Sequence, residues 1–220
     1  IFSTLITNER MAFLIVFFGF LNFLFFYVIK KKNYKLLILI PITFIILAIF
    51  IKQNQTVYKQ LIVKTDKYFG GIYKPINIID TPHGVHWVTA YKIFKDDVYF
   101  GAGLKNFRLK CSDSIYSTNN KFDQVRCSTH PHNIFFEFIS ETGILGTIFF
   151  IIFIFSVILE KIRNISDPIF FTFSLSIFLY LWPIGTNGSF FSTWNGSFFW
   201  LFLGILLAVK KNILLNKNEN

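Results

Sequence analysis

Apolar runs about as long as a bilayer is thick constrain this chain of 220 residues more than any other feature. The first run, Met11–Ile29, would extend about 29 Å as an α-helix, enough to cross the hydrocarbon core. Further runs are Leu36–Ile51, a stretch that ends at Leu159, Ile169–Ile184 and Phe190–Val209. Hydrophobic residues make up 53% of the chain and Phe alone contributes 31 residues, more than a soluble domain usually contains. The sequence therefore predicts an all-α polytopic membrane protein with about five transmembrane helices.

Short basic segments between these runs predict how the helices are oriented. Four lysines closely follow the first run, Glu160–Arg163 follows the third, and Lys210–Lys211 follows the last. Because short Lys-rich loops stay in the cytoplasm, the long polar segment between the second and third runs is predicted to be periplasmic. We expect three regions: two transmembrane helices in 1–51, a partly helical periplasmic loop domain in 52–133, and an interfacial helix, three transmembrane helices and a short cytoplasmic tail in 134–220.

The chain is basic, with a net charge of +10. Segment 52–133 contains twelve Lys or Arg residues and six Asp or Glu residues. This excess suits anionic lipid headgroups or an anionic substrate such as a pyrophosphate, although ordinary solvated charge explains most of these lysines. Because the charge is divided among several loops, nucleic acid is not expected as a partner. No charged leader precedes a short apolar region, so we predict no signal peptide and expect the chain to be the C-terminal portion of a longer protein.

The segment His130-Pro131-His132-Asn133 lies where the polar segment meets the third apolar run. Pro131 favours an extended backbone before it, and a helical pattern begins just after it. His132 is therefore predicted to lie near a helix N-terminus, where the helix dipole and free N–H groups favour an anion. An imidazole there suits proton transfer next to a phosphate-bearing lipid, with a pKa near ~6.5. The alternative is a polar helix cap with two surface histidines.

Several features of the predicted loop domain concern its structure. Trp87–Phe94 has apolar residues at helical spacing, which predicts an amphipathic helix. Gly101 and Gly103 permit a tight turn, but no strand–helix pattern of a dinucleotide site surrounds them. Cys111 and Cys127 are the only cysteines. A disulfide between them is permitted in the periplasm, where it would contribute about 3 kcal/mol by constraining the unfolded chain.

The spacing of the two cysteines fits no zinc site. The histidine pairs His83-x2-His86 and His130-x-His132 are the alternative set of metal ligands, but the expected chemistry needs no metal, so none is expected. Glu137 and Glu141 lie one turn apart on the predicted helix after Asn133. They are candidates to orient the imidazole, with a solvated helix face as the alternative.

Three motifs resemble those of the O-antigen ligase family and its polymerase relatives, which are bacterial inner-membrane glycosyltransferases. The most specific is His132-Asn133, nine residues, then Gly143-x-x-Gly146. Arg10-x3-Leu14 is similar to the family's Arg-x3-Leu at the periplasmic mouth of an earlier span. Gly101-x-Gly103-x3-Phe107 is similar to a stretch of its large periplasmic loop.

The resemblance implies a GT-C-like fold and a metal-independent, inverting transfer of a glycan from a polyprenyl-pyrophosphate donor. The acceptor would be a hydroxyl of lipid A–core or a similar glycolipid. The alternative is a polysaccharide polymerase, whose acceptor is another lipid-linked repeat unit. The reaction needs no cofactor, and its site would face the periplasm.

The same resemblance, together with the chemistry of the residues, suggests roles for individual side chains. His132 would be the general base and Arg10 would pair with pyrophosphate oxygens, because a guanidinium stays protonated and binds in a bidentate manner. Structural roles are expected for Gly143, Gly146, Cys111 and Cys127. Substrate contacts are expected from Asn133, Arg108, Lys105, Gly101, Gly103 and Glu141.

A transporter and a non-catalytic scaffold are the competing classes. Transporters commonly place ionisable residues near the bilayer midplane, and none of the five predicted spans contains Asp, Glu, Lys, Arg or His. A scaffold would leave the histidine segment without a purpose.

Overall fold

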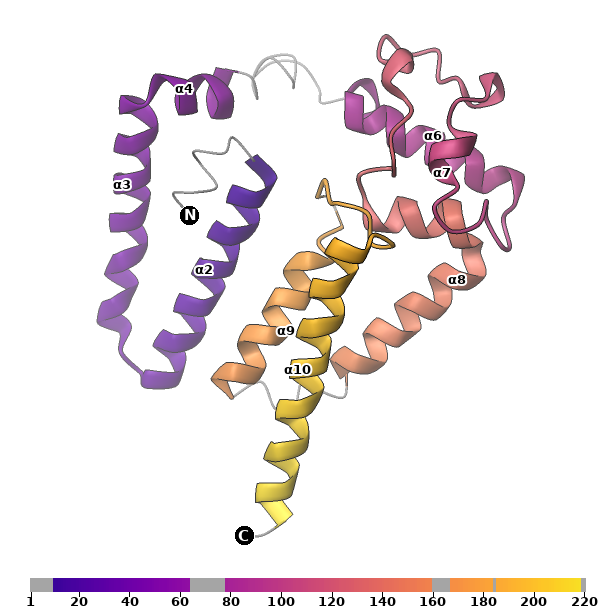
Figure 1. Cartoon of the computed structure of the whole chain (residues 1–220). Coiled ribbons are helices and arrows are strands. Elements are labelled where there is room, and N and C mark those ends of the chain that lie inside the picture. The colour runs from indigo at the N-terminus through magenta and orange to yellow at the C-terminus, as the bar shows by residue number, and fades with distance from the viewer. Residues whose placement is uncertain (1–9, 64–77, 160–166, 184, 219–220) are drawn as a thin grey trace. The chain divides into compact units, whose positions relative to one another are not determined.

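The computed structural model describes residues 10–63, 78–159, 167–183 and 185–218 (Figure 1). Within these residues every regular element is a helix, which confirms the prediction of an all-α protein. The chain divides into two compact units, Ile1–Ile76 and Asn77–Asn220.

The first unit is a helical hairpin. Asn33 N donates to Val28 O and Lys32 adopts a φ of 51°, which reverses the chain between the two long helices. Phe13 and Leu47 pack together with Val57 in a small core at the other end of the hairpin. Its elements are α2 (Arg10–Lys31), η1 (Tyr34–Ile38), α3 (Leu39–Gln53), α4 (Gln55–Tyr58) and η2 (Lys59–Val63).

The second unit combines a small disulfide-linked region with three apolar helices (Figure 1). Its long elements are α6 (Pro82–Asp96), α8 (Ile134–Leu159), α9 (Pro168–Tyr180) and α10 (Thr193–Asn218). Shorter ones are η3 (Ile78–Asp80), α7 (Phe107–Lys110), η4 (Ser114–Tyr116) and η5 (Asp123–Val125). The predicted amphipathic helix is therefore confirmed, and α6 is longer than the predicted Trp87–Phe94. It packs on α8, where the Trp87 and Phe136 rings stack with centroids 5.5 Å apart.

Helices α8, α9 and α10 share an aromatic-rich core. Phe138 stacks on Phe150 with ring centroids 4.0 Å apart, and Phe190 meets Phe199 at 5.1 Å. Other members are Phe170, Ile177, Leu203 and Leu206. Burial of such large rings is a strong driving force for packing, so this core fixes the loop between α9 and α10 against α8.

Three of the described helices are long and apolar enough to cross a membrane: Ala12–Lys31, Tyr34–Gln53 and Ile134–Val157. Two shorter apolar helices, Pro168–Tyr180 and Thr193–Ala208, occupy the regions where the fourth and fifth spans are predicted. The structure thus supports a membrane protein, whereas the count of five crossings, the periplasmic side of the loop domain and the division into three regions remain predictions.

Candidate functional site

Helix α8 is broken at Gly143, where φ is 64° and ψ is −166°. The break separates the segment 134–142 from the longer apolar stretch of the helix. At Gly146 there is no Cβ, which leaves room for the Thr142 side chain.

The loop after α6 replaces the backbone hydrogen bonds that the break removes. Ala102 N donates to Ser140 O (2.8 Å) and Gly103 N donates to Glu141 O (2.9 Å). On the other side of the break, Ile144 N donates to Val98 O (2.8 Å). These bonds satisfy carbonyls at the end of one helical segment and an N–H at the start of the next, groups that a helix terminus leaves without partners. The N–H groups of Ala102 and Gly103 therefore cap α8, and Gly101 N donates to Asp97 O (3.0 Å), so a phosphate would have to bind to other donors.

Glu141 holds the same loop from inside α8. Its carboxylate accepts from Lys105 N (2.6 Å) and Phe107 N (3.2 Å), and only 1% of the residue is exposed. The Glu141 side chain, for which a substrate contact is predicted, therefore has a structural role: it holds the loop after α6. Burial without such partners would be costly for a carboxylate.

Glu137 has a similar anchoring task, and it lies one turn before Glu141 in α8. Its carboxylate accepts from Ser189 Oγ (2.5 Å) and Phe190 N (2.7 Å) in the loop between α9 and α10. In the part of the chain that the structure describes, both carboxylates accept hydrogen bonds from these loops, and a role for either of them in orienting His132 remains a prediction. They anchor the two loops that flank the first segment of α8.

Asn133 is the N-cap of α8 and is 2% exposed. Its Oδ1 accepts from Phe135 N (3.0 Å) and Phe136 N (3.2 Å), which satisfies N–H groups of the first turn. Its Nδ2 donates to Pro183 O (2.8 Å) and Gly185 O (3.2 Å). The side chain thus fixes the start of α8 to the loop after α9, while the substrate contact at Asn133 remains a prediction.

His132 adopts a φ of 57°, which is uncommon for a residue with a side chain. Its carbonyl oxygen accepts from Asn187 N (2.9 Å). The next residue, Asn133, is held in place by its hydrogen bond to Pro183 O. Backbone strain of this kind persists only where the surroundings hold it, and it is concentrated at functional sites. The half-buried imidazole contacts Ser128 Oγ through Nε2 at 2.9 Å.

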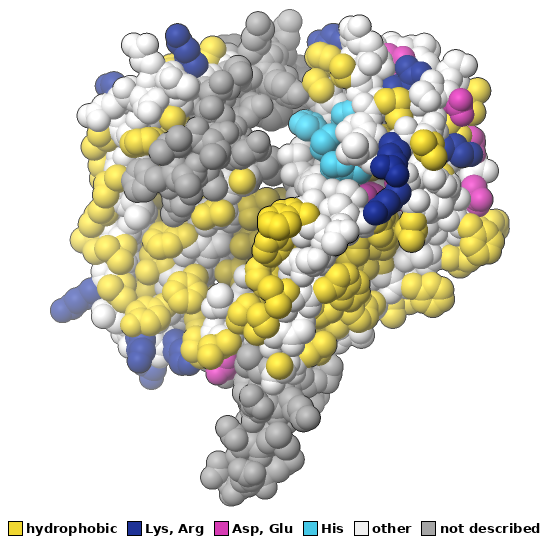
Figure 2. All heavy atoms as spheres, in the orientation of Figure 1, with side chains coloured by type: hydrophobic (Ala, Val, Ile, Leu, Met, Phe, Trp, Pro, Cys, Tyr) yellow, Lys and Arg dark blue, Asp and Glu magenta, His cyan; other side chains and the backbone are white. Residues whose placement is uncertain are grey.

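All four histidines of the chain lie together in the second unit. The ring centroid of His132 lies 4.3 Å from that of His130, 5.0 Å from that of His86 and 5.4 Å from that of His83. Because a carbonyl oxygen only accepts, His86 Nδ1 carries a proton and donates it to Arg126 O (2.9 Å). Figure 2 shows the imidazoles gathered in one place on the surface, with Lys and Arg side chains nearby.

This clustering changes the expected protonation of His132. Burial, followed by the neighbouring His130, His86 and His83, lowers its pKa to about 4, below the value near ~6.5 predicted from the sequence. Burial also lowers the pKa of His86 and of His130. The imidazole of His132 is therefore neutral at neutral pH, the form that a general base requires.

No group of three or more His, Cys, Asp or Glu side chains within the described ranges has the geometry to hold a metal ion. Lys105 and Arg108, the second-tier phosphate candidates, are exposed on the loop that Glu141 anchors. Arg10 is the first residue of α2 in the other unit, and its side chain lies outside the described residues. Its pairing with pyrophosphate oxygens remains a prediction.

The disulfide that the sequence permits is present in the structure. Cys111 and Cys127 are bonded, with Cα atoms 5.2 Å apart. Arg126 reinforces the link because its Nε donates to Cys111 O (2.9 Å) while its guanidinium pairs with Asp123 at 2.7 Å. The bridge fixes the carbonyl of Arg126 that orients His86.

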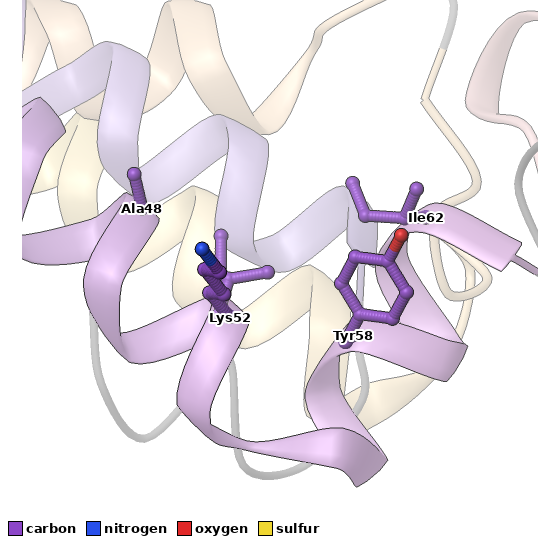
Figure 3. Close-up of a pocket in the computed structure, with 5 residues that line it drawn as sticks. Ala48, Lys52, Tyr58 and Ile62 are labelled. Atoms are coloured by element: carbon purple, nitrogen blue, oxygen red, sulfur yellow. The ribbon is translucent and has the colours of Figure 1, made fainter.

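A pocket of about 520 Å³ lies in the first unit (Figure 3). Ala48, Lys52, Tyr58 and Ile62 line it at the junction of α3, α4 and η2, together with Ile51. None of the predicted site residues contributes to it.

A family model described as O-antigen ligase matches residues 1–151. The chain belongs to the O-antigen ligase family. The matched region contains all three motifs, including the segment from His132 to Gly146, and it supports a membrane glycosyltransferase of the ligase or polymerase kind. Searches of curated proteins and of solved structures found no match.

In this member of the O-antigen ligase family, His83 and His86 are the site residues that sequence reasoning missed, because the sequence raises them only as metal ligands. Their spacing of three residues on a helix places both on one face, which is a usable signal. Nevertheless, it is the packing of α6 on α8 that brings this face of α6 next to His132.

Proposed function

We propose that this protein transfers a glycan from a polyprenyl-pyrophosphate donor to a hydroxyl group of a lipid A–core or similar glycolipid acceptor. The match of the O-antigen ligase family over residues 1–151 carries this proposal. The strained backbone of His132, its neutral imidazole and its fixed position at the start of α8 support it.

In the proposed reaction the acceptor oxygen attacks the anomeric carbon while the bond from that carbon to the pyrophosphate oxygen breaks. The acceptor proton passes to His132. Donation of His132 Nε2–H to Ser128 Oγ would leave the lone pair on Nδ1, which then accepts the proton. Attack on the face opposite the leaving group inverts the anomeric configuration. No step requires a metal ion or a cofactor.

The leaving pyrophosphate gains negative charge as the bond breaks, so cationic side chains lower the barrier. We propose Arg10 for this role, with Lys105 and Arg108 as further contacts to phosphate. The last two are exposed, and the anchored backbone of Lys105 limits where they reach. A guanidinium suits the task because it remains charged and pairs with two oxygens at once.

A transfer assay with purified protein, a lipid-pyrophosphate-linked glycan and either acceptor tests the proposal. His132→Ala is expected to lower transfer by about 10²–10⁴-fold, the usual contribution of general-base catalysis. His130→Ala is the matched control, because His130 belongs to the same cluster but lies outside the motif, and it should be milder. Near-wild-type transfer by His132→Ala would show that His132 is not the base. Transfer only to a second lipid-linked repeat unit would identify a polymerase instead of a ligase.

A further inference from the structure

Three large apolar side chains stand out from the loop domain beside the break in α8. Tyr99 is 66% exposed, Phe100 is 71% exposed and Leu104 is 59% exposed. They flank the Gly-x-Gly turn, whose backbone is fixed to α8 on both sides of Gly143. The exposed side chains therefore project from a rigid turn, where apolar exposure to water is unfavourable.

The turn continues the apolar surface of α8. Val98 O accepts from Ile144 N, so the loop lies beside the first residues after the break. Further along α8, Ile148 is 45% exposed and Phe149 is 70% exposed, as expected for side chains that face lipid. Figure 2 shows hydrophobic side chains over this region of the molecule up to the edge of the loop domain, where charged side chains begin.

The edge of this surface has the composition of a membrane interface. Lys95 Nζ lies 4.7 Å from the centroid of the Tyr91 ring, and Lys105 and Arg108 are exposed beyond the turn. Segment 91–110 has five Lys or Arg residues, including Lys110 at its end, and two Asp residues. Aromatic rings bordered by basic groups are typical of the headgroup level, where the rings enter the acyl boundary and the cations meet anionic lipids.

We propose that Tyr99, Phe100 and Leu104 form a membrane anchor that inserts into the lipid leaflet bordering the loop domain. The occupant of this apolar surface is the bilayer itself, because the surface is continuous with a helix that is long and apolar enough to cross it. Insertion fixes the turn, and through it the break in α8 and the histidine cluster, at a set height above the hydrocarbon core. The proposal does not depend on the glycosyltransferase activity.

Site-directed spin labelling tests the anchor in the chain reconstituted in vesicles of phosphatidylethanolamine and phosphatidylglycerol. Both native cysteines are in the disulfide, so Phe100→Cys provides a single site for a nitroxide label. Phe149→Cys on the exposed face of α8 is the lipid reference. Gln124→Cys, at a polar residue of η5, is the water reference. Relaxation of each label by oxygen, which concentrates in lipid, is compared with relaxation by a water-soluble nickel chelate.

The label at residue 100 is expected to favour oxygen over nickel, as the label at residue 149 does, although at a shallower depth. A label in place of Leu104 should behave in the same way, which guards against a local disturbance at one position. Nickel accessibility at both positions equal to that at residue 124 would overturn the proposal. Spin–spin broadening at residue 100 that disappears on dilution with unlabelled protein would overturn it too, because a second copy would then cover the surface.

Discussion

Gly101 and Gly143 meet with no space for a side chain between them: a Cβ atom on Gly101 would lie 2.6 Å from the backbone nitrogen of Gly143. Both residues also have positive φ, 69° and 64°. Two family motifs that are far apart in the sequence are thus one structural element, a turn packed against a broken helix.

Gly101→Ala should therefore destabilise the second unit. The added methyl group meets backbone atoms, and the left-handed conformation is unfavourable with a Cβ, so we expect a loss of about 2–4 kcal/mol in the free energy of unfolding. Thermal unfolding in detergent measures this. Gly204→Ala is the matched control, because nothing lies within 4 Å of its Cβ position in α10, and it should leave the melting temperature unchanged or raised. Equal melting temperatures for the two variants would contradict the close contact.

Asn133→Ser should separate the two tasks of Asn133. Serine remains a good N-cap, but its side chain is too short to reach Pro183 O and Gly185 O. The loss of that donor should cost about 1–3 kcal/mol and should also lower transfer, because the segment that positions His132 loosens. Asn133→Ala should cost about 1 kcal/mol more, since the cap is lost as well. Thermal unfolding and the transfer assay provide the two measurements. A serine variant with wild-type stability and activity would show that the link to the loop is unimportant.

The pH dependence of transfer should reflect the histidine cluster. The neutral imidazole is the active form, and the pKa of His132 is lowered to about 4, so transfer should persist on mild acidification and fall only as the pH approaches that value. His86→Asn retains a donor for Arg126 O but removes one of the groups that lower the pKa of His132. The acid limb of its rate profile should therefore move to higher pH, with little change in transfer under mildly alkaline conditions. Uniformly reduced transfer with an unchanged acid limb would assign His86 a structural role only.

Reduction of the Cys111–Cys127 disulfide should change the electrophoretic mobility of the denatured protein and weaken the loop domain. We expect the double variant Cys111→Ser, Cys127→Ser to lose about 3 kcal/mol of stability by the chain-entropy estimate. It should also have reduced transfer, because Arg126 next to the bridge orients His86. Alkylation of both thiols without a reductant would show that the bridge is absent in solution.

The sequence alone is sufficient for the features that depend on neighbouring residues. Apolar runs predict membrane helices because each segment must by itself keep apolar side chains out of water. It must also pair its own backbone N–H and C=O groups within lipid, which a helix does. Pro131 and the helical pattern that follows it predict where α8 begins, because the signals that start a helix belong to a few consecutive residues. With only two cysteines, the disulfide has one possible pairing.

The tertiary structure decides which distant residues meet. His86 and His132 are far apart in the sequence, and they share a site only because α6 packs across the first segment of α8. The spacing of Glu137 and Glu141 suggests a shared task near the imidazole, whereas packing directs one carboxylate to Ser189 and the other to Lys105 N. Likewise, the Gly-x-Gly turn suggests contacts to substrate, whereas in the structure the N–H groups of Ala102 and Gly103 cap a broken helix. Hydrogen-bond partners across the fold are set by burial and packing geometry, which the spacing of residues does not encode.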